Sequence, residues 1–263
     1  MQLIVYFIIC LIATTVGAIS GIGGGVIIKP VFDAFSGFPV ATISFLSGCT
    51  VLAMSIVSML RARGDSIKIE PRRGTLLAVG AAIGGVAGKQ IFEYIASLAA
   101  NDGLVGVVQS IIMILLTLGV LIYVLNKSKI TTHNMQNALL CALIGLFLGI
   151  MSAFLGIGGG PINLVVLYFC FSMDTKTAAL NSIYIILISQ ITSFASTIIT
   201  GKLPQMNLFV LFVMVLGGIL GGFIGRAFNK KMSAKQVDTL FLCLLIAIIG
   251  ISIYNFYKFA CLL

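Results

Sequence analysis

Long apolar runs recur from one end of the chain to the other, with short polar segments between them. A run of about 20 apolar residues spans the hydrocarbon core of a bilayer as a single helix. Only 9% of the 263 residues are charged and 60% are hydrophobic, whereas a soluble domain carries about 25% charged residues to cover its surface. The chain is therefore predicted to be an all-α polytopic integral membrane protein, with the lipid bilayer as its main surroundings.

Other classes of protein are excluded by what the chain lacks. Its net charge of +9 would suggest a nucleic-acid partner in a soluble protein, but most basic residues lie in the short polar breaks, where they set membrane topology. The six cysteines lie in apolar runs without a CxxC pair, and the single histidine lies in a linker. No metal ligands, cofactor motif, P-loop or paired catalytic carboxylates are present. We expect no enzyme, no cofactor, no metal and no nucleic-acid partner.

The chain contains an internal repeat that covers nearly its whole length. The pattern Gly-Ile-Gly-Gly-Gly at residues 21–25 recurs 135 residues later at residues 156–160, and each copy follows a long apolar run. Three-glycine series spaced as GxxxGxxxG also occur in both parts, at Gly80/Gly84/Gly88 and Gly217/Gly221/Gly225. The halves are residues 1–127 and 136–263, joined by a polar linker over residues 128–135.

Each half is predicted to contain one glycine-broken hairpin and three long helices. In the first half the hairpin covers about 3–35 and the helices about 40–60, 75–97 and 104–126; in the second half the hairpin covers about 137–172 and the helices about 177–200, 206–228 and 237–258. The pieces after the glycines, 25–35 and 161–172, are too short for an upright crossing. They are either tilted half-crossings or the return arms of re-entrant hairpins.

Loop charges predict that the two halves are inverted in the membrane. The break after the first long helix is basic in the first half (Arg61, Arg63, Lys68, Arg72, Arg73), whereas its counterpart holds only Lys202. The next break reverses this, because residues 97–103 hold no Lys or Arg and the counterpart holds Lys230, Lys231 and Lys235. Since positive loops face the cytoplasm, equivalent loops lie on opposite sides. Both termini are then expected outside.

The glycine breaks are the strongest candidates for a binding site. Irregular backbone at membrane depth is tolerated only where it is buried in protein or lines a water-filled cavity. Glycine permits positive φ and uncovers amide N–H groups, so such a loop at a helix N-terminus can bind an anion. Two such loops on inverted halves are expected to meet near the membrane midplane. The candidates are Gly21, Gly23, Gly24 and Gly25 in one loop, and Gly156, Gly158, Gly159 and Gly160 in the other. The alternative is that these glycines serve close helix packing.

Polar side chains near the loops are further candidates. Ser47 and Ser182 occupy equivalent positions in the repeat, Thr50 and Asn181 lie close to them in sequence, and Asn163 follows the second glycine loop. Their hydroxyl and amide groups could replace the water shell of an oxyanion. The alternative is that they bond only to their own helix backbone or to a neighbouring helix.

The remaining features of the apolar segments are glycine series and a few charges. The GxxxGxxxG series are expected to let helices approach closely. Lys89 and Arg226, which follow these series, are expected to extend toward the membrane surfaces, since Glu93 lies four residues after Lys89 and Arg226 is near a helix end. The alternative is that they attract an anion. Lys29 and Asp33 form a charge pair inside an apolar stretch, and an ionisable residue at depth is functional by default. The second half has no such lysine, so Lys29 is a candidate outside the symmetric core.

Both glycine motifs, SGIGGGVIIKP at 20–30 and LGIGGGPIN at 155–163, resemble those of the sulfite exporter TauE/SafE family. The spacing to PVATISFLSG (39–48) and DTKTAALNS (174–182) fits as well. The resemblance implies an inner-membrane permease that exports sulfite, sulfonates or related small anions. It adds Pro161 to the site candidates, beside Asn163. The coupling ion, a proton or another cation, and the oligomeric state, with a homodimer as one candidate, are not defined by it.

The sequence therefore favours a secondary transporter of a small sulfur-containing oxyanion, working by alternating access around the two glycine loops. A passive anion channel is the alternative in another class. A membrane scaffold without a substrate does not account for the broken helices.

Overall fold

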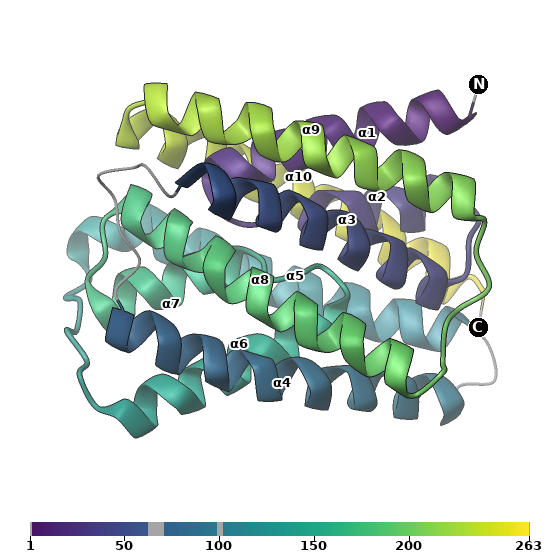
Figure 1. Cartoon of the computed structure of the whole chain (residues 1–263), viewed down its shortest axis with the longest axis horizontal. Coiled ribbons are helices and arrows are strands. Elements are labelled where there is room, and N and C mark those ends of the chain that lie inside the picture. Colours follow the sequence, from purple (N-terminus) through teal and green to yellow (C-terminus); the bar gives the residue numbers. More distant parts are fainter. Residues whose placement is uncertain (1, 63–70, 99–101, 263) are drawn as a thin grey trace.

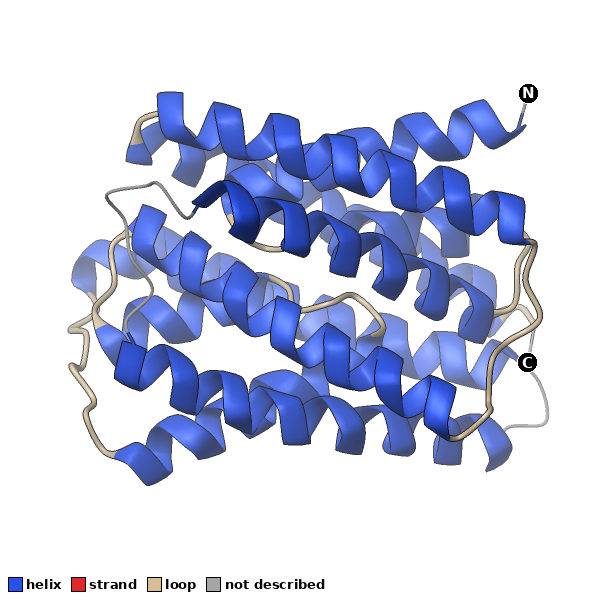
Figure 2. Ribbon diagram, viewed as in Figure 1, coloured by secondary structure: helices blue, strands red, loops and turns tan. Residues whose placement is uncertain are grey.

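The computed structural model describes residues 2–62, 71–98 and 102–262, and every regular element in these ranges is a helix (Figures 1 and 2). The first half contains α1 (Gln2–Ser20), α2 (Gly25–Phe35), α3 (Val40–Ala62), α4 (Pro71–Leu98) and α5 (Asp102–Asn126). A 3-10 turn, η1 (Lys127–Lys129), opens the linker. The second half contains α6 (Ala138–Leu155), α7 (Pro161–Phe171), α8 (Thr175–Ile199), α9 (Leu208–Lys231) and α10 (Ala234–Ala260). The prediction of an all-α polytopic membrane protein is confirmed.

Eight of the described helices are long and apolar enough to cross a membrane. The two others, α2 and α7, have 11 residues each, which corresponds to about 16 Å of helix and half of a bilayer core. Helices α4 and α10 begin four and three residues earlier than predicted. At α10 the reason is a capping box between Ser233 and Gln236, a polar start signal that apolar periodicity does not contain.

The short helices are the return arms of re-entrant hairpins. Helix α2 runs back along α1, since the rings of Tyr6 and Phe32 lie 5.0 Å apart and Gly24 packs against Thr14. Helix α7 ends beside the linker that precedes α6, where the N–H of Met135 donates to the carbonyl of Cys170 at 3.0 Å. Each hairpin therefore enters and leaves at one end of the bundle, and its tip is the glycine loop.

Both termini lie at one end of the bundle, on the right in Figure 1; we call this the termini end. Helix α3 ends at the opposite end, and α4 begins there. The linker and the α9–α10 turn also lie at that opposite end, so Arg72, Lys129, Lys230 and Lys231 are located there. Of the predicted basic loop residues, Arg63 and Lys68 lie outside the described residues, as do residues 99–101 of the uncharged loop.

The glycine series join the two halves. On α4, a Cβ at Gly80, Gly84 or Gly88 would meet the backbone carbonyls of α6. On α9, a Cβ at Gly217, Gly221 or Gly225 would meet backbone atoms of α1. Each glycine series thus packs against the first helix of the other half, at a distance that any side chain would prevent. The predicted close helix approach is confirmed.

Candidate functional site

Both glycine loops adopt backbone conformations that suit glycine. In the first loop φ is +82° at Gly21 and +81° at Gly23. In the second loop all four glycines have positive φ, which reaches +128° at Gly159. A side chain at such angles collides with its own backbone. The two loops therefore depend on glycine for their shape as well as for space.

The two loops contact one another at the centre of the bundle, as the repeat predicted. A Cβ at Gly25 would strike the carbonyl of Ile157, and a Cβ at Gly23 would lie 3.5 Å from the carbonyl oxygen of Gly158. Two fully buried apolar side chains pack between the loops: Val51 of α3 contacts Gly158, and Ile186 of α8 contacts Gly159. These side chains are 135 residues apart, which is the spacing of the glycine motifs. The loop contact is therefore closed by one apolar side chain from each half.

Each loop leads into the N-terminus of a short helix. Helix α2 begins at Gly25 and α7 begins at Pro161, the position in a first turn where proline costs no hydrogen bond. Among the described residues, no backbone hydrogen bond is donated by the N–H groups of Gly158, Gly159 and Gly160. Uncovered amides and the positive end of a helix dipole favour negative charge. The second hairpin tip therefore has the polarity of an anion site, whereas in the first loop the N–H groups of Gly21 and Gly23 donate to the carbonyl of Gly17.

A small polar cavity lies beside the second loop, between the parts of α3, α4 and α8 that are nearest the termini end. Its wall is built by α3, α4, α6 and α8, and it includes Ser44, Gly48, Cys49, Lys89, Phe92, Gly156, Gln190, Ser193 and Thr197. Lys89 is the charged residue in this wall, and the other polar groups are hydroxyls, an amide and a thiol. The wall thus combines one cation with several hydrogen-bond donors.

Lys89 lies inside this cavity and does not extend to the membrane surface. Its side chain is 11% exposed, and its Nζ lies 3.9 Å from a carboxylate oxygen of Glu93. The same carboxylate accepts a 2.9 Å hydrogen bond from Lys202 in the α8–α9 loop. The prediction for Lys89 is therefore wrong, because the α4–α6 and α4–α8 contacts turn this face of α4 inward. The Lys202–Glu93 pair lies one helical turn further along α4 than Lys89.

The prediction for Arg226 is also wrong. Its side chain is 2% exposed and donates to Asn229 at 3.2 Å, and Asn229 in turn donates to the carbonyl of Ile19 at 2.6 Å. Arg226 follows the α9 glycines as Lys89 follows those of α4. On its side of the bundle, Gly21 packs directly against Ala179. The cavity beside Lys89 is therefore matched by tight packing around Arg226.

The other predicted donors fall into two groups. Ser47, Ser182 and Asn163 are fully buried, and their side-chain polar atoms have no partner among the described residues. Thr50 instead donates to the carbonyl of Leu46, and Asn181 donates to the carbonyl of Thr177. Of all the predicted site residues, Gly156 alone lines the cavity beside Lys89. Lys29 lines a separate cavity between α2, α5 and α10.

These features define a polytopic membrane transporter: eight spans, two re-entrant hairpins whose broken tips meet at the centre, and a polar cavity that leads to them. The chain belongs to the sulfite exporter TauE/SafE family, whose model matches residues 6–252. It is 26% identical to the probable membrane transporter protein YunE of Bacillus subtilis (strain 168), over 94% of this chain and 96% of that protein. No solved structure matches the chain.

Several site residues were missed by sequence reasoning. Gln190 and Cys49 line the cavity, and Val51 and Ile186 close the loop contact. Val51 and Ile186 could have been identified from the repeat, since each lies four positions after one of the equivalent serines Ser47 and Ser182. Gln190 could have been recognised from the sequence as an amide side chain within an apolar helix, although the glycine motifs are the stronger sequence feature.

Proposed function

We propose that the protein is a secondary transporter that exports a small sulfur-containing oxyanion, such as sulfite or an organosulfonate, by alternating access around the two glycine loops. Its membership of the TauE/SafE family supports the transport function and the class of substrate. With both termini outside, the cavity beside Lys89 lies on the release side of this exporter, and the anion leaves the second glycine loop at Gly156 through it.

The observation that carries this proposal is the position of Lys89. It supplies the positive charge in the wall of a cavity that otherwise offers hydroxyl, amide and thiol groups. The Coulomb attraction between an anion and an ammonium about 4 Å apart is about 4 kcal/mol at an effective dielectric constant of 20. The carboxylate of Glu93, 3.9 Å from the Lys89 Nζ, opposes part of this attraction, and Lys202 in turn pairs with Glu93. The donors of Ser44, Gln190 and Ser193 can replace part of the water shell that an oxyanion loses. The site therefore favours small anions over neutral molecules or cations.

Alternating access is supported by the arrangement of the halves. Their first helices, α1 and α6, run in opposite directions in Figure 1, which agrees with inverted repeats. The cavity opens on one side of the loop contact, beside Lys89, and the equivalent region beside Arg226 is packed. An inverted pair of repeats can exchange these two environments by rocking one unit against the other. Arg226 would then take the role of Lys89 on the opposite side.

The proposal is tested with purified protein in proteoliposomes, with a panel of sulfite, sulfate, thiosulfate and methanesulfonate. Lys89→Met is expected to reduce uptake of the preferred anion at least tenfold, and Lys89→Arg should retain more of it because the charge remains. Lys235→Met is the matched control, because Lys235 is exposed at the start of α10. Wild-type flux in Lys89→Met would refute the assignment of the cavity.

The same vesicles separate a carrier from a channel. Saturable uptake that is stimulated by anion on the opposite side is expected for alternating access, and single-channel currents would indicate a channel. The buried side chains of Val51 and Ile186 pack against both glycine loops, which supports a carrier over an open channel.

A further inference from the structure

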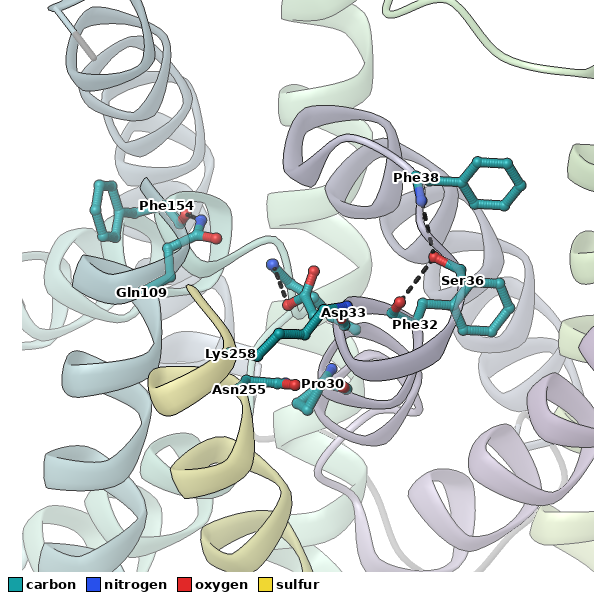
Figure 3. Close-up of polar contacts among 10 residues, drawn as sticks. Pro30, Phe32, Asp33, Ser36, Phe38, Gln109, Phe154, Asn255 and Lys258 are labelled. Atoms are coloured by element: carbon teal, nitrogen blue, oxygen red, sulfur yellow. Dashed lines mark hydrogen bonds and ion pairs between the residues drawn. The ribbon is translucent and has the colours of Figure 1, made fainter. Parts of the chain in front are cut away.

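A second small polar cavity lies between α2, α5 and α10. It is lined by Lys29 and Asp33 of α2, Gln109 of α5, and Ser252 and Asn255 of α10. All five side chains are at least nine-tenths buried. Figure 3 shows Gln109 and Asp33 facing one another, with Asn255 and Lys258 approaching α2 from α10.

The amide groups in this cavity have defined orientations. The Nε2 atom of Gln109 donates to the carbonyl of Phe154 at 2.7 Å, and Nδ2 of Asn255 donates to the carbonyl of Pro30 at 2.8 Å. The reverse orientation would place two oxygen acceptors against each other. The amide oxygens are therefore left as acceptors, and neither has a partner among the described residues.

The carboxylate of Asp33 adds a further unsatisfied acceptor. Its Oδ2 atom accepts a 2.7 Å hydrogen bond from the ammonium of Lys29. Its Oδ1 atom and the hydroxyl of Ser252 are buried and have no partner among the described residues. Buried acceptors without donors are costly. A hydrogen-bond donor or a cation placed among them would relieve this cost.

The contacts around Asp33 favour a proton over a metal cation. Lys29 occupies one carboxylate oxygen, and Lys258 donates to the backbone carbonyls of Asp33 and Ala34 at 2.7 and 3.0 Å. The described side chains that α5 and α6 contribute to the wall are uncharged. A metal ion needs several oxygen ligands and would compete with the Lys29 ammonium. A proton needs only Oδ1, and the resulting O–H can donate to a neighbouring amide oxygen.

The cavity is connected to both glycine loops. Gln109 holds the carbonyl of Phe154, two residues before Gly156. Asp33 and Pro30 belong to the helix that starts at Gly25. A change in the charge of Asp33 therefore acts on the return arm of one hairpin, and through Gln109 on the tip of the other.

The fold itself does not require this polar cluster. At the spacing of the repeat, Lys29 and Asp33 correspond to Leu164 and Tyr168 in α7, which are buried in the main apolar core. In the second half, the ammonium of Lys127 lies 3.9 Å from the centre of the Tyr168 ring, and this contact stands where the first half has the Lys29–Asp33 ion pair. Only one half thus carries the cluster, which a purely structural role in a repeated fold does not explain.

We propose that Asp33 is the proton-binding group that couples a proton to anion transport: its carboxylate takes up a proton at Oδ1 and releases it again during the transport cycle. This inference rests on the proposed transport function. In the protonated state the carboxyl donates to Gln109 or Asn255, and Lys29 loses its counter-charge. The return arm α2 then has two different electrostatic environments, one for each protonation state.

The test uses proteoliposomes and methanesulfonate, because the charge of a sulfonate does not change with pH. Asp33→Asn is expected to retain exchange of methanesulfonate at equal pH and to lose, at least tenfold, both its accumulation under a pH gradient and the accompanying proton flux. Tyr168→Phe is the matched control at the equivalent position and should keep both activities. Lys29→Met/Asp33→Asn removes both charges, so it avoids an unpaired buried lysine and should show the same selective loss.

Two results would overturn the proposal. One is pH-driven accumulation in both Asp33 variants that stays within twofold of wild type. The other is accumulation that follows a sodium gradient and not a pH gradient. If the wild-type protein transports none of the anions, the proposed function fails, and the proton site is tested separately by infrared titration of the purified protein. A protonated-carboxyl band that is present in the wild type and absent in Asp33→Asn supports the site, and an unchanged band refutes it.

Discussion

Gly159 provides the sharpest test of the glycine loops, through the substitution Gly159→Ala. Its φ of +128° is a conformation that L side chains rarely adopt, and holding a residue there costs about 1–3 kcal/mol. The new Cβ would also press on the Ile186 side chain and lie 3.1 Å from Nδ2 of Asn163. Overpacking of this kind costs a further amount of about 1–3 kcal/mol. The total of about 2–6 kcal/mol is large enough to reshape the loop, so we expect transport to fall at least tenfold.

The two contributions can be separated with a second substitution. Ile186→Ala removes the atoms that the new methyl group would strike, but it leaves the backbone conformation unchanged. A double-mutant cycle of thermal unfolding in detergent should therefore give a coupling of about 1–3 kcal/mol, the overpacking part alone. Gly250→Ala is the control, because Gly250 lies within α10 with no atom close to its Cβ position. We expect wild-type flux and a gain of about 0.5–1 kcal/mol there.

Flux within twofold of wild type in Gly159→Ala, together with an unchanged unfolding temperature, would refute this reasoning. The loop would then tolerate a side chain, and its glycines would not be needed for the contact at the centre of the bundle. A coupling near zero in the cycle would show that Ile186 does not press on this loop.

Two further predictions concern the helices around the site. Gly84→Val should destabilise the protein by an amount at the upper end of about 1–3 kcal/mol, seen as a lower unfolding temperature, because its Cβ would meet backbone atoms of Leu146 and Ile150 in α6. Gly119→Val should have little effect, because no atom lies near its Cβ position. Asp174 caps α8, and although partial burial alone would raise the pKa of Asp174, hydrogen bonds from Thr177 and Lys176 outweigh burial and hold that pKa below its usual value. Asp174→Ala should therefore cost about 0.5–2 kcal/mol near neutral pH, measured as thermal unfolding. The difference should vanish as the pH falls through the lowered pKa of Asp174, and a pH-independent difference would contradict the assignment.

The sequence by itself predicted the parts of the structure that depend on local patterns. Helix length and apolar content determine where a chain can cross a bilayer, and eight spans were found close to their predicted limits. The glycine motifs predicted both breaks, because an irregular backbone in an apolar run needs residues that allow positive φ. The packing role of Gly80, Gly84 and Gly88 also followed from their spacing alone.

Tertiary structure decided what the side chains at these positions face. Helical periodicity places Lys89 and Arg226 on similar faces of similar helices, so the sequence predicted one fate for both. In the structure one side of the loop contact is open and the other is packed, so Lys89 lines a cavity and Arg226 is buried. Whether α2 crosses or returns was equally undecided, because the length of a helix does not define its direction. The cluster around Asp33 is formed by residues from α2, α5 and α10, and only their packing could bring these unsatisfied acceptors to one place.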